Sequence, residues 1–433
     1  MREMKDSGIA WIGQIPKDWN IRLLSSYFTE HKCKNRMLEE HNLLSLSYGR
    51  IIRKDIETKE GLLPESFDGY NIIEDGDIVF RLTDLQNDKR SLRTGLCHER
   101  GIITSAYITL RKQQPLNPSF YHYLFHAYDL CKVFYGLGDG VRQGMNFKDL
   151  RKLPILTLSL EEQQRIAEFL DGKCAEIDQL VALQEQFIEE LKAYKQSVIT
   201  EAVTKGLDPN VAMKDSGSKW LGKIPTSWEI MPVKYIFTRR SQRNNPIVTK
   251  ERLSLSIDKG ITLYSEKTTN LDRFKEDFTQ YQIAHPNDIV LNCMNMIVGA
   301  VGMSAYLGCV SPVYYVITAD TNIALPKYYS YLLNIPTIRG VYYSFGKGIY
   351  AIERGEGRVN TCRLKVGYND FGRIEIPVPS ISEQQIIVDF IEQKSSEIDN
   401  LINMKQQKIE ELKEYKKSMI YEYVTGKKEV PTA

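Results

Sequence analysis

The chain has 433 residues, of which 42% are hydrophobic and 26% are charged, and its formal net charge is +2 at pH 7. A chain of this length ordinarily holds two or three domains, and its apolar fraction is ample for packed cores, which excludes a disordered protein. Seven cysteines without a Cys-x-x-Cys pair fit neither a disulfide framework nor a zinc site. The N-terminal residues are polar and resemble no secretory signal, so we expect a cytoplasmic protein.

The first element is the phrase MKDSGIAWIGQIPKDW at Met4–Trp19, which returns as MKDSGSKWLGKIPTSW at Met213–Trp228. A second segment, LSLSYGR at Leu44–Arg50, returns as LSLSIDKG at Leu253–Gly260. The repeat predicts a tandem duplication in which a mixed globular region is followed by a long charged segment. The ends of the two copies match well and their middles match poorly, which indicates two sites of one kind with different specificities.

Residues 117–134 of the first copy carry apolar side chains at helical spacing and predict a helix. His122 and His126 lie four residues apart on it without a His-Glu-x-x-His motif, so we interpret them as ordinary helix residues and not as metal ligands. The stretch FYGLGDG at Phe134–Gly140 resembles the glycine motif of S-adenosylmethionine-dependent methyltransferases. Because a helix and not a strand precedes it, we expect a loop there and no bound cofactor.

Other catalytic motifs are missing from the sequence. There is no Walker loop, no Asp/Asn-Pro-Pro-Tyr/Phe motif and no nuclease constellation. We therefore predict that the chain is not an enzyme and that it binds no metal and no cofactor by itself.

The strongest match between the copies is the pair of long segments Ser159–Gly206 and Ser380–Gly426. Each begins with Ser-x-x-Glu, which predicts a helix that starts with a capping box. The resulting domain boundaries are 1–158 for a first globular region, 159–207 for a central helix, 208–379 for a second globular region and 380–433 for a C-terminal helix.

Apolar residues in both segments alternate at spacings of three and four, as in a coiled-coil seam. The seam residues are Ile177, Val181, Ile188 and Leu191 in the first segment and Ile398, Ile402, Ile409 and Leu412 in the second. Polar residues interrupt both seams at matching places, for example Lys195 and Lys416. We predict an antiparallel pair of helices that acts as a ruler between the globular parts; the alternative is that each helix packs on its own globular region.

The longest uncharged stretch of the second copy, Ile289–Val310, is long enough to span a bilayer. It contains two Asn, several Gly and a Ser, and its counterpart in the first copy is full of charge. We therefore predict two strands joined by a turn and not a membrane helix.

Charge is distributed unevenly along the chain. Residues 1–158 and 208–379 carry net charges of about +3 and +6, whereas residues 159–207 and 380–433 carry about −5 and −2. This division suits globular regions that face a polyanion such as double-stranded DNA and helices that face protein. The candidate DNA contacts, chosen from basic clusters with Asn or Gln, are Lys32, Lys34, Arg36, Arg50, Arg53, Lys54, Arg90, Arg142, Gln143, Arg239, Arg240, Arg243, Asn244, Lys347, Arg354 and Arg358. Each cluster alone could be a solvated surface loop.

The order of these motifs resembles the specificity subunit of bacterial and archaeal type I restriction-modification systems. The resemblance rests on the W-x-G-x-I-P-x-x-W openings at Trp11–Trp19 and Trp220–Trp228, on the strands GDIVF and NDIVL, and on the two Glu-Gln-Gln helices. It extends over both halves of the chain. The resemblance does not assign a role to any individual residue in the variable globular regions.

The resemblance implies an α+β fold with two pseudo-repeated target recognition domains separated by two long antiparallel coiled-coil helices. Each recognition domain would read one half of a split DNA sequence. Two methyltransferase subunits that use S-adenosylmethionine would methylate adenine, and restriction subunits that use ATP and Mg would join them. The chain itself would bind no cofactor and catalyse neither reaction.

Two other functions are compatible with part of the sequence. A protein–protein scaffold would use the coiled coil and leave the basic loops solvated, and it predicts no sequence-dependent DNA binding. A single-chain methyltransferase would require S-adenosylmethionine binding, which the missing catalytic motif disfavours.

Overall fold

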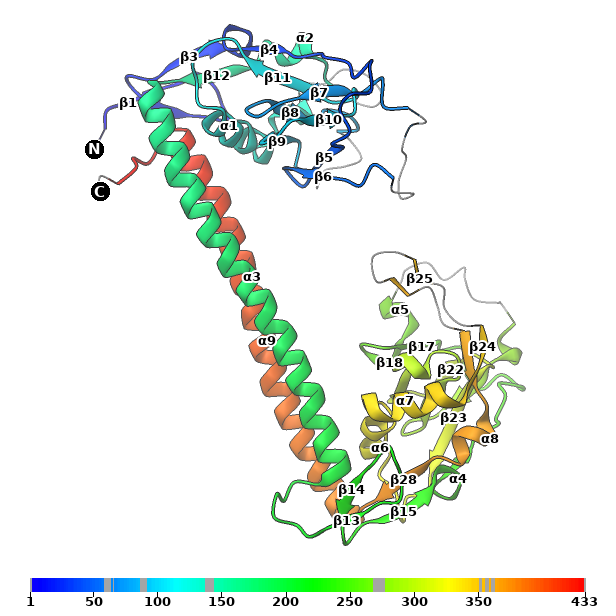
Figure 1. The fold of residues 1–433 in the computed structure, drawn as a ribbon. Helices are drawn as coiled ribbons and strands as arrows, with labels where there is room; N and C mark the ends of the chain where they lie inside the picture. Colours follow the sequence, from blue (N-terminus) through cyan, green and yellow to red (C-terminus); the bar gives the residue numbers. More distant parts are fainter. Residues whose placement is uncertain are drawn as a thin grey trace. The chain divides into compact units, whose positions relative to one another are not determined.

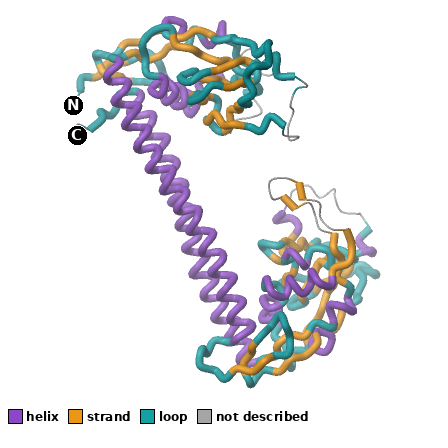
Figure 2. Tube along the Cα trace, in the orientation of Figure 1, coloured by secondary structure: helices purple, strands orange, loops and turns teal. Residues whose placement is uncertain are grey.

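The computed structural model describes residues 2–57, 64, 66–85, 92–136, 144–267, 277–349, 353–354, 358–359 and 363–431. The chain divides into two units (Figures 1 and 2). Unit 1 comprises Met1–Glu185 with Gln406–Ala433, and unit 2 comprises Gln186–Lys405. Each unit therefore combines one globular region with part of each long helix.

Unit 1 is built around an antiparallel sheet in the order β4-β11-β8-β9. The pairs β1-β2, β3-β12, β5-β6 and β7-β10 are two-stranded and antiparallel. The elements are β1 (Met4–Asp6), β2 (Gln14–Pro16), β3 (Asn20–Leu23), η1 (Leu24–Ser26), β4 (Phe28–Glu30), β5 (Leu44–Ser47), β6 (Arg50–Arg53), β7 (Asn71–Ile73), β8 (Ile78–Phe80), β9 (Thr94–Leu96), β10 (Gly101–Ile103), β11 (Ile108–Lys112), α1 (Pro118–Leu130), η2 (Val133–Gly136), α2 (Phe147–Leu150) and β12 (Pro154–Thr157).

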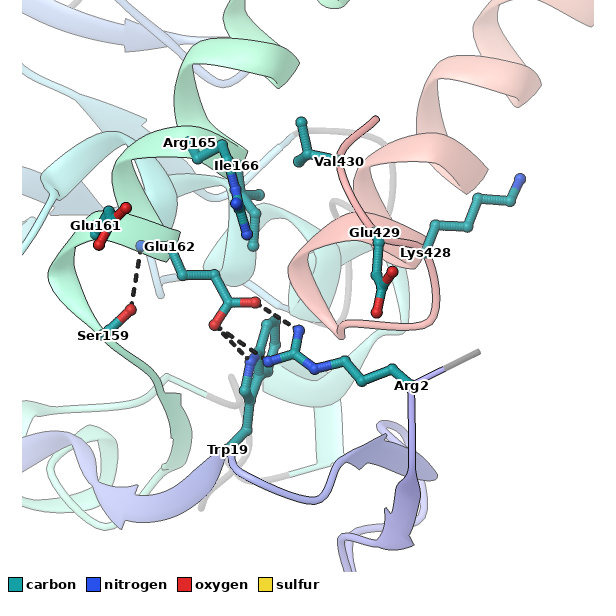
Figure 3. Close-up of a pocket in the computed structure, with 10 residues that line it drawn as sticks. All are labelled: Arg2, Trp19, Ser159, Glu161, Glu162, Arg165, Ile166, Lys428, Glu429 and Val430. Carbon is teal, nitrogen blue, oxygen red and sulfur yellow. Dashed lines mark hydrogen bonds and ion pairs between the residues drawn. The ribbon is translucent and has the colours of Figure 1, made fainter. Parts of the chain in front are cut away.

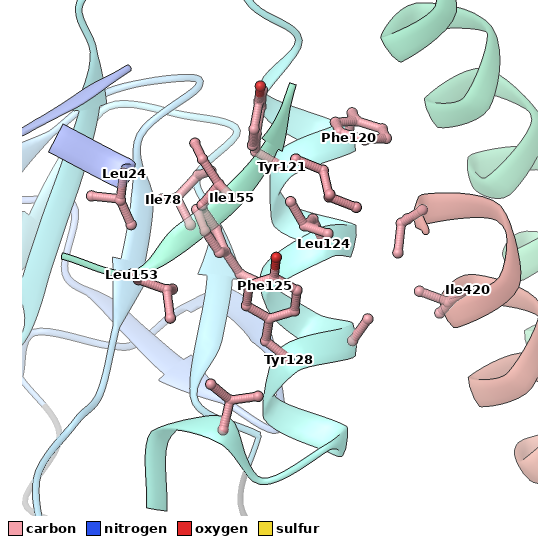
Figure 4. Close-up of a cluster of buried hydrophobic side chains, with 14 of the residues drawn as sticks. Leu24, Ile78, Phe120, Tyr121, Leu124, Phe125, Tyr128, Leu153, Ile155 and Ile420 are labelled. Atoms are coloured by element: carbon pink, nitrogen blue, oxygen red, sulfur yellow. The ribbon is translucent and has the colours of Figure 1, made fainter. Parts of the chain in front are cut away.

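Helix α1 covers the core of this unit (Figure 4). The Asn117 side chain accepts a hydrogen bond from the Phe120 amide at 3.0 Å, and Pro118 occupies the first turn, so the helix begins where capping favours it. Phe120 and Phe125 are fully buried, and Phe125 meets Phe80 edge to face with ring centroids 5.1 Å apart. The helix predicted over residues 117–134 is confirmed over Pro118–Leu130.

Unit 2 repeats the sheet in the order β16-β23-β20-β21, with antiparallel pairs β13-β14, β15-β28, β17-β18, β19-β22, β24-β27 and β25-β26. The elements are β13 (Met213–Asp215), β14 (Lys223–Pro225), β15 (Glu229–Pro232), α4 (Val233–Ile236), β16 (Phe237–Arg239), β17 (Leu253–Ser256), β18 (Gly260–Leu263), α5 (Tyr264–Lys267), η3 (Phe278–Gln280), β19 (Gln282–Ala284), β20 (Ile289–Asn292), η4 (Met296–Val298), β21 (Val301–Met303), β22 (Gly308–Val310), β23 (Tyr314–Ala319), α6 (Pro326–Leu332), α7 (Pro336–Phe345), β24 (Gly346–Ile349), β25 (Glu353–Arg354), β26 (Arg358–Val359), β27 (Arg363–Val366), α8 (Tyr368–Gly372) and β28 (Glu375–Val378).

The uncharged stretch 289–310 forms three strands, β20, β21 and β22, and not the two that the sequence predicted. A second turn causes the difference, because the Ser304 hydroxyl accepts from the Tyr306 amide at 3.2 Å and donates to the Tyr306 carbonyl at 2.8 Å. None of the helices in the described part of the chain combines the length and the apolar character needed to span a bilayer.

Helices α3 (Leu160–Lys205) and α9 (Ile381–Val424) run antiparallel within each unit. In unit 1 the Phe169 and Tyr423 rings lie 4.6 Å apart, and in unit 2 Lys195 Nζ lies 2.8 Å from the Asp399 carboxylate. Of the eight expected seam residues, five are buried and three are half-buried. The buried ones are Ile177, Ile188, Ile398, Ile402 and Ile409, and the half-buried ones are Val181, Leu191 and Leu412.

The ends of the long helices also pack on the globular regions. Ile166 and Val424 belong to the core of unit 1, and Val203 and Ile387 belong to the core of unit 2. Helix pairing and packing on the globular region thus occur together, in different parts of the same helices. The predicted α+β class, with repeated globular regions and an antiparallel coiled coil, is confirmed.

Candidate nucleic-acid interface

The repeated opening phrase of unit 1 joins the globular region to the helices (Figure 3). The Trp19 indole is buried and donates to the Glu162 carboxylate at 3.0 Å, and the Arg2 guanidinium binds the same carboxylate. Bonding to Glu162 and Asp18 raises the pKa of Arg2 above its usual value. Arg2, Trp19 and Glu162 line a cavity of about 400 Å³. Their polar groups bind one another, so this contact anchors the start of α3.

The long helices show one of the two hydrogen bonds of the predicted capping box, the one accepted by the serine. The Ser159 and Ser380 hydroxyls accept from the amides of Glu162 and Glu383 at 3.2 and 3.3 Å, as in a capping box. The Glu162 carboxylate does not return to the helix start, because it binds Arg2 and Trp19. Glu162 therefore connects the first turn of the helix to Trp19 of the opening phrase.

A glycine follows each long helix and lies against the opening phrase of one copy. Gly206 and Gly426 have φ of +77° and +71°, a conformation that favours glycine. A Cβ on Gly426 would lie 2.4 Å from Pro16 and 3.1 Å from Trp19, and one on Gly206 would lie 3.4 Å from Trp228. Each copy of the phrase therefore packs on the end of a helix.

The hairpin β5-β6 carries two exposed predicted contacts of unit 1, Arg50 and Arg53. Its turn, Tyr48-Gly49, has φ of +45° and +79°, as in a two-residue hairpin turn with both central residues at positive φ, and the Tyr48 side chain is 79% exposed. The Arg53 guanidinium binds Glu99, with Nε at 2.9 and 2.7 Å from its two carboxylate oxygens. Arg50 Nη2 lies 2.8 Å from the Asp178 carboxylate on α3, and Lys54 is exposed beyond the hairpin.

The basic loop after β4 is organised by a buried asparagine. Asn35 donates to the Glu40 carbonyl at 2.9 Å and accepts from the Glu40 amide at 3.2 Å. Lys32 Nζ lies 2.9 Å from Glu30, and Lys34 Nζ donates to the Gly69 carbonyl at 2.7 Å. Arg36 is exposed.

The equivalent asparagine of unit 2, Asn244, is a structural residue. It is 0% exposed, donates to the Thr249 carbonyl at 2.8 Å and accepts from the Val248 amide at 2.7 Å. A side chain without exposed surface cannot reach a base edge, so the prediction that Asn244 contacts DNA is wrong. The neighbouring Arg243 is exposed.

Arg239 and Arg240 occupy different environments. The Arg240 guanidinium binds the buried Asp288 through Nε at 2.7 Å and Nη2 at 3.1 Å, so it is committed to the fold. The Arg239 guanidinium lies 5.1 Å from the ring centroids of both Tyr315 and Tyr368, as in cation–π contacts with two neighbouring rings. Arg239 is exposed and its guanidinium is held by the two rings.

In unit 1 the equivalent buried aspartate also binds an arginine, but this arginine comes from a different strand. Asp77, the counterpart of Asp288, is buried and binds the Arg111 guanidinium at 2.8 and 2.7 Å. Arg111 comes from β11, whereas Arg240 follows β16. Both carboxylates also accept a turn amide, from Glu74 and His285 respectively.

The remaining predicted contacts are incompletely described. Lys347 on β24 is exposed, with Nζ 3.7 Å from the Asp370 carboxylate. For Arg354 and Arg358 the structure describes only the backbone, in β25 and β26. Arg90, Arg142 and Gln143 lie outside the described residues. The predicted contacts whose side chains are described belong to separate loops and strands of the two units.

Arg93 is a residue whose role the sequence did not show. It is fully buried, and its guanidinium donates to the carbonyls of Thr83 at 3.0 Å and Asp84 at 3.4 Å. Its backbone amide donates to the Asp129 carboxylate at 2.6 Å. Arg93 therefore ties the segment after β8 to α1. In the sequence it is one more charge in a basic cluster, with no pattern that separates it from surface residues.

His122 and His126 lie on α1, and in the described part of the chain no group of three potential ligands is placed to hold a metal ion. Burial lowers the pKa of His122 to about 3 and that of His126 to about 4. Both rings are therefore neutral near pH 7.

Comparisons with known proteins agree with this architecture. A family model described as "Type I restriction modification DNA specificity domain" matches residues 101–193. Two curated proteins of Methanocaldococcus jannaschii are similar to this chain. The putative type I restriction enzyme MjaX specificity subunit is 22% identical over 443 residues, with coverage of 97% of this chain and 96% of that protein. The type I restriction enzyme MjaVIII specificity subunit is 22% identical over 340 residues, with coverage of 76% and 75%.

Two solved structures share the fold. A chain from "Structural basis underlying complex assembly and conformational transition of the type I R-M system" has a TM-score of 0.64 and 13% identity, with coverage of 95% of this chain and 98% of that chain. The HsdS subunit from Thermoanaerobacter tengcongensis has a TM-score of 0.51, 13% identity and the same coverages of 95% and 98%.

Proposed function

We propose, from the premise that this chain is a type I restriction-modification specificity subunit, that each globular region reads one half of a split DNA sequence. The matching family model and the two similar curated proteins agree with the resemblance seen in the sequence. In the proposed role the chain selects the site at which partner subunits act, and it catalyses neither methylation nor cleavage.

The observation that carries this proposal is the repeated sheet with different surroundings in the two copies. The sheets β4-β11-β8-β9 and β16-β23-β20-β21 have the same strand order. Corresponding surface positions carry different chemistry: Glu30 at the end of β4 is matched by Arg239 at the end of β16. A common framework with different side chains suits two readers of the same kind that recognise different sequences.

The proposed partners follow from the family resemblance. Two methyltransferase subunits would bind S-adenosylmethionine and methylate adenine, and restriction subunits would use ATP and Mg for translocation and cleavage. The proposed complex acts on double-stranded DNA in the cytoplasm. Two linked readers gain affinity because the second binding event is intramolecular.

Single-molecule sequencing of host DNA tests the split site. The chain is co-expressed with its adenine methyltransferase, and methylated adenines are mapped across the genome. Replacement of residues 20–157 by the equivalent region of another specificity subunit should change one half of the motif, and replacement of residues 229–378 should change the other half. A continuous motif, or a motif that changes in both halves after one replacement, would contradict two independent readers.

The length of the helices provides a second test. One heptad added to both α3 and α9 lengthens the pair by roughly 10 Å, or about three base pairs. The proposal expects a longer nonspecific spacer and unchanged half-sites. A heptad added to α3 alone is the control, since it mismatches the seam and should abolish methylation.

A further inference from the structure

Unit 1 contains an open cleft that the proposed recognition of bases does not use. A cavity of about 480 Å³ lies between the β5-β6 turn, α1, α3 and α9. A second cavity of about 700 Å³ shares Tyr48, Leu92 and Lys417 with it. The two form one groove beside α9, and the basic lining residues from that helix are Lys413, Lys416 and Lys417.

Positive charge exceeds negative charge around the first cavity. The cations are Arg50 and the three lysines of α9, and the carboxylates are Asp171 and Asp178. Arg50 Nη2 and Lys416 Nζ lie 2.8 and 2.7 Å from the two oxygens of Asp178, so two cations share one carboxylate. Asp171 accepts a hydrogen bond from the Tyr123 hydroxyl at 2.7 Å.

Lys413 and Lys417 are held weakly. Each pairs with a glutamate three residues earlier on the same helix, Lys413 with Glu410 at 3.5 Å and Lys417 with Glu414 at 2.5 Å, and both lysines are about half exposed. Exposed pairs of this kind contribute little to stability. A phosphate group can therefore replace the glutamate at small cost.

The charges of Lys416 and Lys417 act on side chains inside the cleft. Burial, together with the charges of Lys416 and Lys417, lowers the pKa of His126. The same Lys416 charge opposes the rise that burial causes in the pKa of Cys174. A groove whose lining carries more cations than carboxylates is suited to an anion that lies along it.

We propose that this groove binds backbone phosphates of the DNA, so that α9 contributes contacts in addition to the recognition domain. This inference rests on the proposed function. It adds phosphate contacts from the lysines of the helix, which raise affinity for any sequence without reading a base. The groove lies directly beside Tyr48 and Arg50 of the β5-β6 hairpin, so the duplex would contact both surfaces together.

The test compares two double variants of the full chain in complex with its methyltransferase. The groove variant is K413A/K417A. The control is K173A/K408A, which also removes two helix lysines of unit 1 that pair with glutamates three residues away but that do not line the groove. DNA affinity is measured by fluorescence anisotropy on a cognate and a scrambled duplex over a range of salt concentrations.

The proposal expects K413A/K417A to bind both duplexes more weakly by roughly tenfold near 0.1 M salt, with a salt slope smaller by about two. K413R/K417R should restore the affinity, and the methylated motif should remain the same. Equal behaviour of the groove and control variants would overturn the proposal. Loss of the methyltransferase from the groove variant would also overturn it, because the groove would then be a protein interface.

The wild-type complex tests the proposed function separately, through its affinities for the two duplexes. If the wild-type complex binds both duplexes equally, the chain does not confer sequence specificity, but the salt slopes still report whether the groove lysines contact phosphates. A wild-type complex without DNA affinity would overturn both proposals.

Discussion

Lys416 Nζ on α9 lies 2.7 Å from Asp178 Oδ1 on α3, and the sequence repeat relates this pair to Lys195 and Asp399, which lie 2.8 Å apart. These two lysines, which interrupt the two seams at matching places, are therefore each paired with a carboxylate of the antiparallel helix. A polar seam residue with one suitable partner favours a single register, since a shifted register would leave the charge beside apolar residues.

The two pairs predict unequal costs of substitution. Asp178 also binds Arg50, so D178N leaves two cations without their carboxylate, whereas D399N leaves one. We expect D399N to lower the free energy of unfolding by about 1 kcal/mol and D178N by about twice that amount. Urea denaturation followed by circular dichroism measures both. The exchange K195D/D399K should recover most of the loss at the second pair; a cost equal to the sum of the single variants would show that the pair contributes nothing.

The two helix-ending glycines predict a matched comparison. G206A and G426A impose the same strain, about 1 kcal/mol, because both residues have positive φ. G426A also places a Cβ 2.4 Å from Pro16, so the opening phrase must move. We expect G426A to lower the melting temperature clearly more than G206A, as measured by calorimetry. Equal shifts would show that the phrase adapts without cost.

The buried Asp288 predicts a large loss of stability. R240A leaves a buried carboxylate without its bidentate partner, which costs about 3–5 kcal/mol. R239A removes only an exposed guanidinium that lies beside the Tyr315 and Tyr368 rings and should cost less than about 1 kcal/mol. Thermal unfolding of the two variants distinguishes a structural arginine from a surface one, and similar melting temperatures would contradict the assignment.

The histidines of α1 predict a pH dependence of stability. Burial lowers the pKa of His126 to about 4 in the folded chain, from 6.5 when it is free. The unfolded chain then binds more protons between these values, so the contribution of the neutral ring is complete above pH 6.5 and is lost as the pH falls toward 4. We expect H126Q to flatten the decline in melting temperature between pH 6.5 and 4.5 relative to the wild type. An unchanged slope would show that His126 is solvated.

The helices and the duplication could be predicted because each leaves a repeated pattern in the sequence. The seam from Ile177 onward, the serines at the helix starts and the opening phrase are all local signals. The roles of Arg93, Arg240 and Asn244 could not be predicted, because a basic cluster reads the same whether its side chains are exposed or buried. Only the folded sheet shows that Asp288 requires a guanidinium and that the loop after β16 requires a buried amide.

The different origins of Arg111 and Arg240 restrict how genes of this kind can recombine. His31 occupies the position in the first copy that Arg240 holds in the second. A crossover between the copies after β4 but before β11 would combine a histidine with the second copy's β23, and the hybrid would contain the buried aspartate with neither arginine. The reciprocal product would bring two guanidiniums to one carboxylate. Viable exchanges are therefore those that carry the edge strand and its central neighbour as a block.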